Sequence, residues 1–311
     1  MAEYITVDSG TTNTRINFVS DRVIVDTLKY SVGTKRDANG NNLLRETLKN
    51  GIDELMKRHK LCKEDITRIL ASGMITSEFG LIQLPHITAP AGIAELHGAM
   101  YETVFEDLSE IPFVFSRGIK TNTYDLENSD IMRGEETELM GIIDGEGVYI
   151  LPGSHSKIIQ VGKDERITNF KTMLTGEMIS ALSEYTILKD AIDLKESKAN
   201  EEYLLKGFEY ADRHGINEAL FEVRILKNIL CRNADDVYGF FMGVILCNEI
   251  KQILSYNPKR IFIGGKKVIK ESEALLLRAI SEAETVVIPD ESENASALGI
   301  VKVYEYRDET I

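Results

Sequence analysis

A run of eight residues near the start of the chain, DSGTTNTR at 8–15, brings together groups that bind phosphate. A glycine lets the backbone approach a ligand closely, and the neighbouring amides and hydroxyls can donate hydrogen bonds to phosphate oxygens. The carboxylate of Asp8 is suited to hold Mg²⁺ through water molecules. The candidate phosphate-binding residues in this run are Gly10, Thr11, Thr12, Asn13 and Arg15. The competing interpretation is an ordinary hairpin turn, in which Gly and Asn serve only the backbone.

The second half of the chain repeats this pattern in LPGSHSK, at 151–157. Residues 4–30 and 148–174 both give a strand, a glycine turn with small polar side chains, a second strand, a polar turn and a third strand. Gly153, Ser154, His155 and Lys157 match Gly10, Thr11, Thr12 and Arg15. Two such turns on opposite sides of a cleft predict a site for the β and γ phosphates of a nucleotide. Pro152 stands where the first half has its acid, so only the first turn carries the metal role.

A glycine pair near the end of the chain, Gly264 and Gly265, follows the apolar run IFI. A backbone without side chains can lie against a flat ring, so we expect this turn to contact the adenosine. A common strand-to-helix turn explains the same residues equally simply. His155 is likewise open to two interpretations, because it can donate to a phosphate or only hold its hairpin.

A cluster of acids at 130–138, in DIMRGEETE, supplies the best local candidates for a catalytic base. Asp130 and Glu135 are the candidates, and Arg133 can orient one of them or bind a substrate carboxylate bidentately. Acids at a helix N-terminus also stabilise the helix dipole while facing water. That simpler role is the preferred interpretation for Glu136 and Glu138.

Charge and composition exclude several classes of function. The 311 residues carry 50 acidic and 36 basic side chains, a net charge of -14, which argues against general nucleic-acid or membrane-surface binding. Cys62, Cys231 and Cys247 are too widely spaced for a disulfide framework or a zinc site. Together with an N-terminus that lacks a signal-peptide profile, this predicts a cytoplasmic protein. We also expect no segment with the roughly 20 apolar residues of a membrane helix.

The elements that must position these residues follow from hydrophobic periodicity. Apolar runs at 4–7, 15–19 and 22–32 predict an antiparallel meander, and Leu44, Leu48, Ile52 and Leu55 form the apolar stripe of a helix over 41–60. Residues 74–98 predict a long ordered loop of the kind that binds ligands. In the second half, helices are expected near 176–192, 198–212, 217–230 and 236–254.

The order of these motifs resembles the superfamily of sugar kinases, actin and the heat-shock ATPase. The segments VDSGTTNTR, SGMITSEFG, DIMRGEETELMG, LPGSHSK and TMLTGEM are similar to motifs of the 2-dehydro-3-deoxygalactonokinases. Ser9 and Ile158 depart from the family pattern, which has an aromatic residue and often Trp at these positions. The resemblance spans residues 7–178 and continues to the glycine pair at 264–265.

This resemblance implies an α/β fold of two ribonuclease-H-like lobes with a cleft between them. Each lobe would hold a mixed sheet with an antiparallel three-strand meander, flanked by helices, with the boundary after residue 135. It implies transfer of the γ-phosphoryl group of ATP, with Mg²⁺, to the 6-hydroxyl of 2-dehydro-3-deoxy-D-galactonate in galactonate breakdown. Thr76, Ser77 and the amide of Gly92 would line the sugar-acid pocket. A spacing of 22 residues before Pro152, similar to that in related kinases, slightly favours Asp130 over Glu135 as base.

Other functions remain compatible with the same motifs. They include a kinase for another sugar or sugar acid, an enzyme that hydrolyses ATP without a sugar acid, and a sugar-sensing regulator. The regulator ranks last, because the chain is strongly acidic and opens directly on its first strand. The expected partner is a small sugar acid rather than nucleic acid or membrane, and a homodimer is left open.

Overall fold

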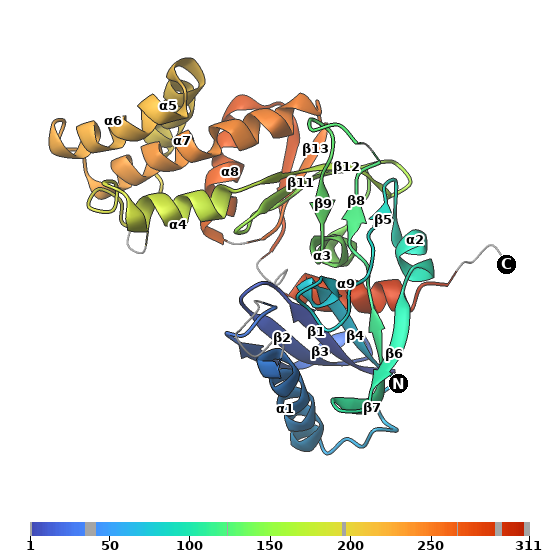
Figure 1. The fold of residues 1–311 in the computed structure, drawn as a ribbon. Coiled ribbons are helices and arrows are strands. Elements are labelled where there is room, and N and C mark those ends of the chain that lie inside the picture. The colour runs from blue at the N-terminus through green and yellow to red at the C-terminus, as the bar shows by residue number, and fades with distance from the viewer. Residues whose placement is uncertain are drawn as a thin grey trace. The chain divides into compact units, whose positions relative to one another are not determined.

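The computed structural model describes residues 2–34, 42–122, 124–194, 197–265, 267–289 and 294–307. Tertiary contacts divide the chain into two compact units. Unit 1 comprises 1–145, 163–169 and 291–311, and unit 2 comprises 146–162 and 170–290 (Figure 1). This division differs from a single boundary after residue 135, because the C-terminal helix packs back onto the first unit.

Unit 1 contains the predicted meander at one side of a mixed sheet. The six strands are β1 (Glu3–Ser9), β2 (Thr14–Ser20), β3 (Val23–Tyr30), β4 (Arg68–Gly73), β6 (Tyr101–Phe105) and β7 (Ser109–Phe115). Their order is β3-β2-β1-β4-β7-β6, in which β1, β2 and β3 are antiparallel neighbours. β4 is parallel to both β1 and β7. This is the arrangement of a ribonuclease-H-like sheet.

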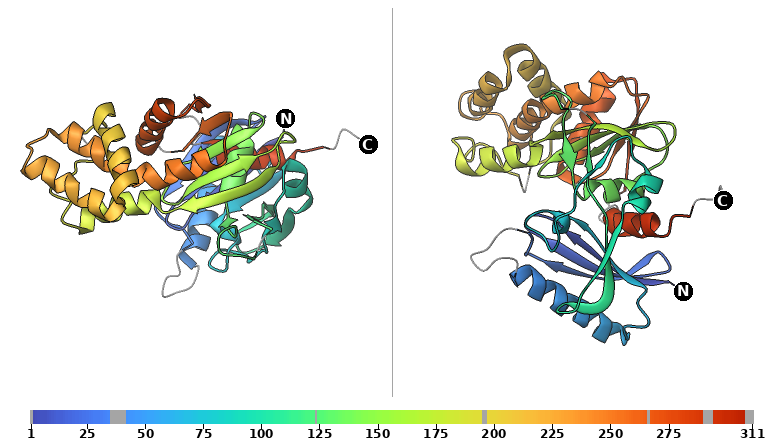
Figure 2. Two further views of the ribbon diagram at one scale, coloured as in Figure 1. Left: turned by 90° about the horizontal axis from the view of Figure 1, so that it is seen from above. Right: turned by 45° about the vertical axis from the view of Figure 1, so that its right-hand side comes forward.

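Helices cover both faces of this sheet because strand residues alternate between the faces. On one face, α1 (Asn42–His59) buries its predicted stripe against Ile5 and Val7. On the other, α9 (Ala295–Tyr304) packs on Tyr4 and Leu70 through Ile300 and Val301. The views of Figure 2 show these two helices on opposite sides of the unit 1 strands.

The segment predicted as a long loop contains short elements. They are the 3-10 turn η1 (Met74–Thr76), the strand β5 (Ile87–Thr88) and α2 (Ile93–Gly98). β5 joins β8 (Ile119–Lys120) and β9 (Ile131–Met132) in a small three-stranded sheet. The prediction of a long ordered loop did not include these pieces, because tertiary hydrogen bonds stabilise elements too short to show a period. The helix whose N-terminus was expected at the acid cluster of 130–138 is present as α3 (Glu135–Ile142).

Unit 2 repeats the sheet of unit 1. Its strands are β10 (Gly147–Leu151), β11 (Ser156–Val161), β12 (Ile167–Met173), β13 (Arg260–Ile263) and β14 (Glu284–Val287). The order β12-β11-β10-β13-β14 places an antiparallel β10–β11 pair beside the parallel strands β10, β13 and β14. The helices are α4 (Thr175–Tyr185), α5 (Glu201–His214), α6 (Ile216–Asn228), α7 (Ala234–Ser255) and α8 (Lys267–Ile280). The predicted α/β fold with two ribonuclease-H-like parts is confirmed.

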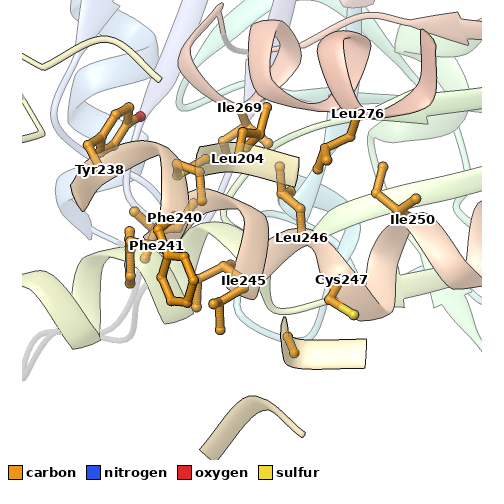
Figure 3. Packing of buried hydrophobic residues seen from close by; sticks show 14 of the residues in the cluster. Leu204, Tyr238, Phe240, Phe241, Ile245, Leu246, Cys247, Ile250, Ile269 and Leu276 are labelled. Carbon is orange, nitrogen blue, oxygen red and sulfur yellow. The ribbon is translucent and has the colours of Figure 1, made fainter. Parts of the chain in front are cut away.

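The core of unit 2 is built around α7, which is apolar on all sides. Its neighbours include α5, α6 and α8, and Figure 3 shows side chains of α7 packed against Leu204, Ile269 and Leu276. Among the described helices, α7 is long and apolar enough to cross a membrane, although no such segment was expected from the sequence. Within its most apolar stretch, 78% is buried inside the protein, as in the core helix of a folded unit.

Candidate active site

The first glycine turn joins β1 to β2 in unit 1. Asp8 lies directly opposite Arg15 in the antiparallel register, with 3.8 Å between Oδ2 and Nη1. Beneath the turn, the hydroxyls of Ser9 and Thr14 form a buried 2.8 Å hydrogen bond. The Gly10 amide donates to the Asn13 carbonyl at 2.9 Å, which closes the loop. The remaining turn residues, Thr11, Thr12 and Asn13, are exposed and available to a ligand.

Two glycines bring the end of β4 and the start of α3 against this strand. Gly73 has φ +87° and ψ -156°, a conformation open essentially to glycine alone, and a Cβ there would lie 2.6 Å from the Ser9 carbonyl oxygen. Gly134, with φ +114°, packs on Gly73, since a Cβ on Gly134 would lie 3.1 Å from the Gly73 Cα. The first turn of α3 therefore lies close to the end of β1, where Asp8 is found.

Asp8, Glu135 and Glu138 form a group of interacting carboxylates at this place. Burial is the main cause that raises the pKa of Asp8, while Arg15 lowers it and Glu135 raises it. The pKa of Glu138 is raised to about 8 by burial first, and then by repulsion from Asp8 and Glu135. The structure thus brings predicted residues Asp8, Arg15 and Glu135 together and adds Glu138, which was expected only to face water.

Glu136 also differs from the sequence expectation, because its side chain is fully buried. One carboxylate oxygen accepts a 2.7 Å hydrogen bond from the Gly134 amide, and the other has no partner among the described residues. Burial, with repulsion from Glu135 second, raises its pKa to about 8. Glu136 packs inside unit 1 because α3 lies against α9, where Gly141 and Gly299 permit close approach of the two helices.

The two candidate bases occupy different settings. Glu135 accepts a 3.0 Å hydrogen bond from the Arg133 amide. Its negative charge contributes to raising the pKa of both Asp8 and Glu138. Asp130 lies ahead of β9, where its Oδ1 accepts a 2.7 Å hydrogen bond from the Ile131 amide. Asp130 is not among the groups that shift the pKa of Asp8 or Glu138. Of the two acids, the structure groups only Glu135 with Asp8.

The guanidinium of Arg133 is engaged inside unit 1. It donates from Nη1 to the Thr76 carbonyl at 2.8 Å and from Nη2 to the Leu84 carbonyl at 3.1 Å. Its Nη2 also lies 3.2 Å from Nε2 of His86, whose pKa is lowered to about 4 by burial first and by Arg133 second. This placement suits a residue that fixes the 74–86 segment beside α3.

The predicted sugar-pocket residues make hydrogen bonds within their own segments. The hydroxyl of Thr76 donates to the Gly73 carbonyl, and that of Ser77 donates to the Met74 carbonyl. The Gly92 amide donates to Glu95 at 2.8 Å, and Gly92 lines a separate cavity of about 210 Å³. Thr76 shares a segment with Gly73, whereas nothing in the structure groups Gly92 with it.

The donor set around Asp8 fits a magnesium ion. Mg²⁺ takes oxygen ligands and keeps several waters, and the carboxylates of Asp8, Glu135 and Glu138 supply oxygen only. A bound divalent cation would relieve the repulsion that, after burial, raises the pKa of Glu138. Among the described residues no three acidic, histidine or cysteine side chains are arranged to hold a metal ion, so Mg²⁺ held through Asp8 would take most of its ligands from water.

In unit 2 the second glycine turn is enclosed by two close contacts. A Cβ on Gly176, at the start of α4, would lie 2.2 Å from the Gly153 carbonyl oxygen, and the Glu177 amide donates to the Ser154 carbonyl. Gly265, with φ +68°, packs on Pro152, where a Cβ would lie 2.5 Å from the carbonyl oxygen. The predicted turn and the predicted glycine pair are therefore neighbours in unit 2.

The side chains of this turn have different environments. His155 is exposed and lies 2.9 Å from a carboxylate oxygen of Glu177. Lys157 is 5% exposed, and its Nζ donates to the Thr172 hydroxyl at 2.6 Å. The Gly264 amide donates to the Ile150 carbonyl, which extends the β10–β13 pairing to the glycine pair. Lys157 is thus held in the sheet, while Ser154 and His155 remain at the surface.

Sequence reasoning missed Gly73, Gly176 and Glu138. A glycine directly after a buried strand, as in ILASG at 69–73, is a signal for a special backbone conformation that could have identified Gly73. Gly176 stands in a motif that was recognised but given no role. The partial burial of Glu138 has no such signal, because it depends on how α3 packs.

Comparison with known proteins agrees with this geometry. The family model for 2-keto-3-deoxy-galactonokinase matches residues 8–303. The 2-dehydro-3-deoxygalactonokinase of Escherichia coli strain K12 is 25% identical over 262 residues, which is 82% of each chain. A candidate 2-dehydro-3-deoxygalactonokinase structure from Sinorhizobium meliloti has a TM-score of 0.76 at 20% identity and covers 96% of this chain and 97% of its own.

A second solved structure shares the fold at greater distance. The activator of the 2-hydroxyisocaproyl-CoA dehydratase from Clostridium difficile, solved with bound ADPNP, has a TM-score of 0.51 at 14% identity, covering 99% of this chain and 100% of its own. At these identities the structures establish the fold, while the family model spans nearly the whole sequence. The chain belongs to the 2-keto-3-deoxy-galactonokinase family and is a sugar-acid kinase.

Proposed function

We propose that this protein transfers the γ-phosphoryl group of ATP to the 6-hydroxyl of 2-dehydro-3-deoxy-D-galactonate, a step of galactonate catabolism. The family match over residues 8–303 carries the proposal. The activity named for the Escherichia coli relative supports the acceptor, and the ADPNP in the dehydratase activator supports the nucleotide. Phosphoryl transfer depends mainly on positioning and charge stabilisation, which the two glycine turns and the carboxylate group are suited to provide.

Each unit has one glycine turn that is proposed to contact phosphate. In unit 1, exposed Thr11, Thr12 and Asn13 offer amides and side-chain donors, and Arg15 adds a positive charge. In unit 2, Ser154 and His155 are the exposed members of the matching turn, with Gly153 and Lys157 behind them. Gly264 and Gly265 would contact the adenosine. Backbone amides held in a fixed geometry stabilise developing charge without reorganising.

Glu135 is now the preferred general base, and Asp130 is the alternative. A base must lie within reach of the proton that it removes, so it belongs near the group that binds the transferred phosphate. Glu135 shares its surroundings with Asp8, and the hydrogen bond from the Arg133 amide fixes its carboxylate. Arg133 itself would act as a positioning residue, through its bonds to Thr76 and Leu84.

Asp8 is proposed to hold Mg²⁺ through water, with Glu138 close by. When bound, the metal would neutralise the charge of the β and γ phosphates. The chain's own contribution is to present Asp8 at the end of a buried strand and to balance it with Arg15. Thr76, Ser77 and Gly92 remain the proposed contacts of the sugar acid.

A coupled assay of ADP formation tests the function. A panel of 2-dehydro-3-deoxy sugar acids, other sugars and a reaction without acceptor should be compared at equal enzyme concentration. We expect the highest kcat/KM with 2-dehydro-3-deoxy-D-galactonate and almost no ADP without acceptor. Equal rates with and without acceptor would identify an ATP hydrolase instead, and a better sugar would replace the proposed acceptor.

Replacing Asp8 by asparagine should weaken the response to magnesium. We expect kcat/KM to fall about 10- to 100-fold, because the carboxylate that orients the hydrated metal is lost. Half-maximal activity should require more Mg²⁺ than in the wild type, measured by titrating MgCl₂ at fixed ATP. Asp107→Asn, at a 63% exposed carboxylate paired with Arg45, is the matched control and should leave the titration unchanged. An unaltered magnesium response in Asp8→Asn would exclude the proposed role.

A further inference from the structure

Two glutamates lie in the interior of unit 2, where apolar residues are expected. Glu249 of α7 is 1% exposed and Glu273 of α8 is fully buried. At helical spacing, Glu249 shares its face of α7 with Leu246, and Glu273 shares its face of α8 with Ile269 and Leu276. Figure 3 shows these three apolar residues in the core formed by the two helices.

Hydrogen bonding of the two carboxyl groups is incomplete if both are ionised. The hydroxyl of Thr175 donates to one oxygen of Glu249. The other oxygen of Glu249 and both oxygens of Glu273 have no donor among the described residues. The two carboxyl groups nevertheless interact, because repulsion from Glu249 adds to burial in raising the pKa of Glu273. Two carboxyl groups can form a hydrogen bond with each other only if one of them carries a proton.

Among the described residues, no positively charged group contributes to the pKa shift of Glu249 or Glu273. The buried side chain of Lys157 donates to the Thr172 hydroxyl, and that of Lys270 donates to the Ile288 carbonyl. Neither lysine is among the groups that shift the pKa of Glu249 or Glu273. Burial is the main cause that raises the pKa of both glutamates, and repulsion from Glu249 raises that of Glu273 further. A single proton shared by the two carboxyl groups would remove one of the two buried negative charges and would supply the missing hydrogen-bond donor.

The pair is connected to the second glycine turn through Thr175 and Ser156. Thr175 is the first residue of α4 and precedes Gly176, which packs on the carbonyl of Gly153. Ser156 is the first residue of β11, directly after the turn, and its hydroxyl is buried. Burial raises the pKa of Glu249 most, and the hydroxyls of Thr175 and Ser156 lower it by a smaller amount. α8, which carries Glu273, begins just after the glycine pair at 264–265.

We propose that Glu249 and Glu273 share one proton and act as positioning residues that hold the turn at 152–156 and the start of α4 in the geometry that binds nucleotide. This inference rests on the proposed ATP site but assigns residues outside it. Glu249 is the carboxylate of the pair, because it accepts from Thr175, and Glu273 carries the proton and donates. Neither residue contacts the reacting groups.

Two substitutions of Glu273 separate the shared proton from simple packing. Glu273→Gln supplies an amide N–H in place of the acid proton, so we expect KM for ATP within about twofold of the wild type. Glu273→Met has a similar length and no donor, which leaves the Glu249 carboxylate short of a partner. We expect it to raise KM for ATP about 10-fold, with kcat and KM for the sugar acid changed less than threefold. Glu271→Gln, on the exposed face of the same helix, is the control.

Thr175→Val provides a second variant if Glu273→Met does not fold. It removes the hydroxyl donor to Glu249 and preserves the shape of the side chain, so KM for ATP should again rise while kcat stays nearly constant. Unchanged KM for ATP in both variants, in an enzyme that remains an active kinase, would overturn the inference and leave the proposed function intact. An inactive wild type would instead contradict the proposed function.

Infrared difference spectroscopy at neutral pH tests the proton itself. The wild-type minus Glu273→Gln spectrum should contain the carbonyl band of one protonated carboxylic acid. Absence of that band would overturn the shared proton. Replacing potassium and sodium salts by choline chloride should not alter KM for ATP. A loss of nucleotide affinity in choline would show that a monovalent cation, and not a proton, joins the two glutamates.

Discussion

Glu135→Gln is expected to lower kcat by about 100-fold or more while the affinity for ATP stays nearly unchanged. The substitution keeps the size of the side chain and the hydrogen bond from the Arg133 amide, but an amide cannot accept the proton of the sugar hydroxyl. Loss of a positioned general base has an effect of roughly this size. Single-turnover measurement of ADP formation, together with calorimetric titration of ADP, separates the chemical step from binding.

Asp130→Asn is the matched variant, because both acids were candidates for the same role. We expect its kcat to stay within about threefold of the wild type, since Asp130 accepts a hydrogen bond from the Ile131 amide and is not among the groups that shift the pKa of Asp8. A 100-fold loss in Asp130→Asn, with Glu135→Gln nearly active, would reverse the assignment and restore the preference that sequence spacing suggested.

Gly73→Ala is expected to reduce the free energy of unfolding by about 3 kcal/mol or more. An alanine would have to adopt a backbone conformation that costs roughly 1–3 kcal/mol, and its Cβ would collide with the Ser9 carbonyl oxygen. Any relief of this collision moves β4 away from β1 or from Gly134, and so displaces Glu135 from Asp8. Urea unfolding followed by circular dichroism measures the stability, and the kinase assay measures the accompanying loss of kcat.

Gly98→Ala is the control for this substitution. Gly98 is the last residue of α2, its φ lies outside the left-handed region, and a Cβ there meets nothing within 4 Å. Its stability should change by less than about 1 kcal/mol. Equal stability of the two alanine variants would contradict the role given to Gly73 in bringing α3 against β1.

Long elements with a clear period were predictable from the sequence. The stripe formed by Leu44, Leu48, Ile52 and Leu55 is buried as expected, because an amphipathic helix of that length has one face that must leave water. The two meanders were also predictable, since each is local and its turns carry Gly, Asn or Asp. The strands β5, β8 and β9 have two residues each, too few to show a period, and β5 pairs with β8 across the segment that contains α2, β6 and β7.

The candidate site was predictable in its residue types but not in its grouping. The repeated glycine turns and the acids near α3 are visible as motifs, and Asp8, Arg15 and Glu135 do lie together. The burial of Glu136 and the partial burial of Glu138 depend on the packing of α3 against α9, a helix more than 150 residues later in the chain. No local pattern reports such a contact, so these acids were assigned to solvent.

Phosphorus-31 NMR of a complete reaction tests the central claim most directly. The protein, ATP, MgCl₂ and 2-dehydro-3-deoxy-D-galactonate should yield ADP and one phosphate monoester whose signal is coupled to the two protons at carbon 6. A signal coupled to a single proton would place the phosphate on another hydroxyl. Inorganic phosphate as the only product besides ADP would contradict the assignment as a sugar-acid kinase.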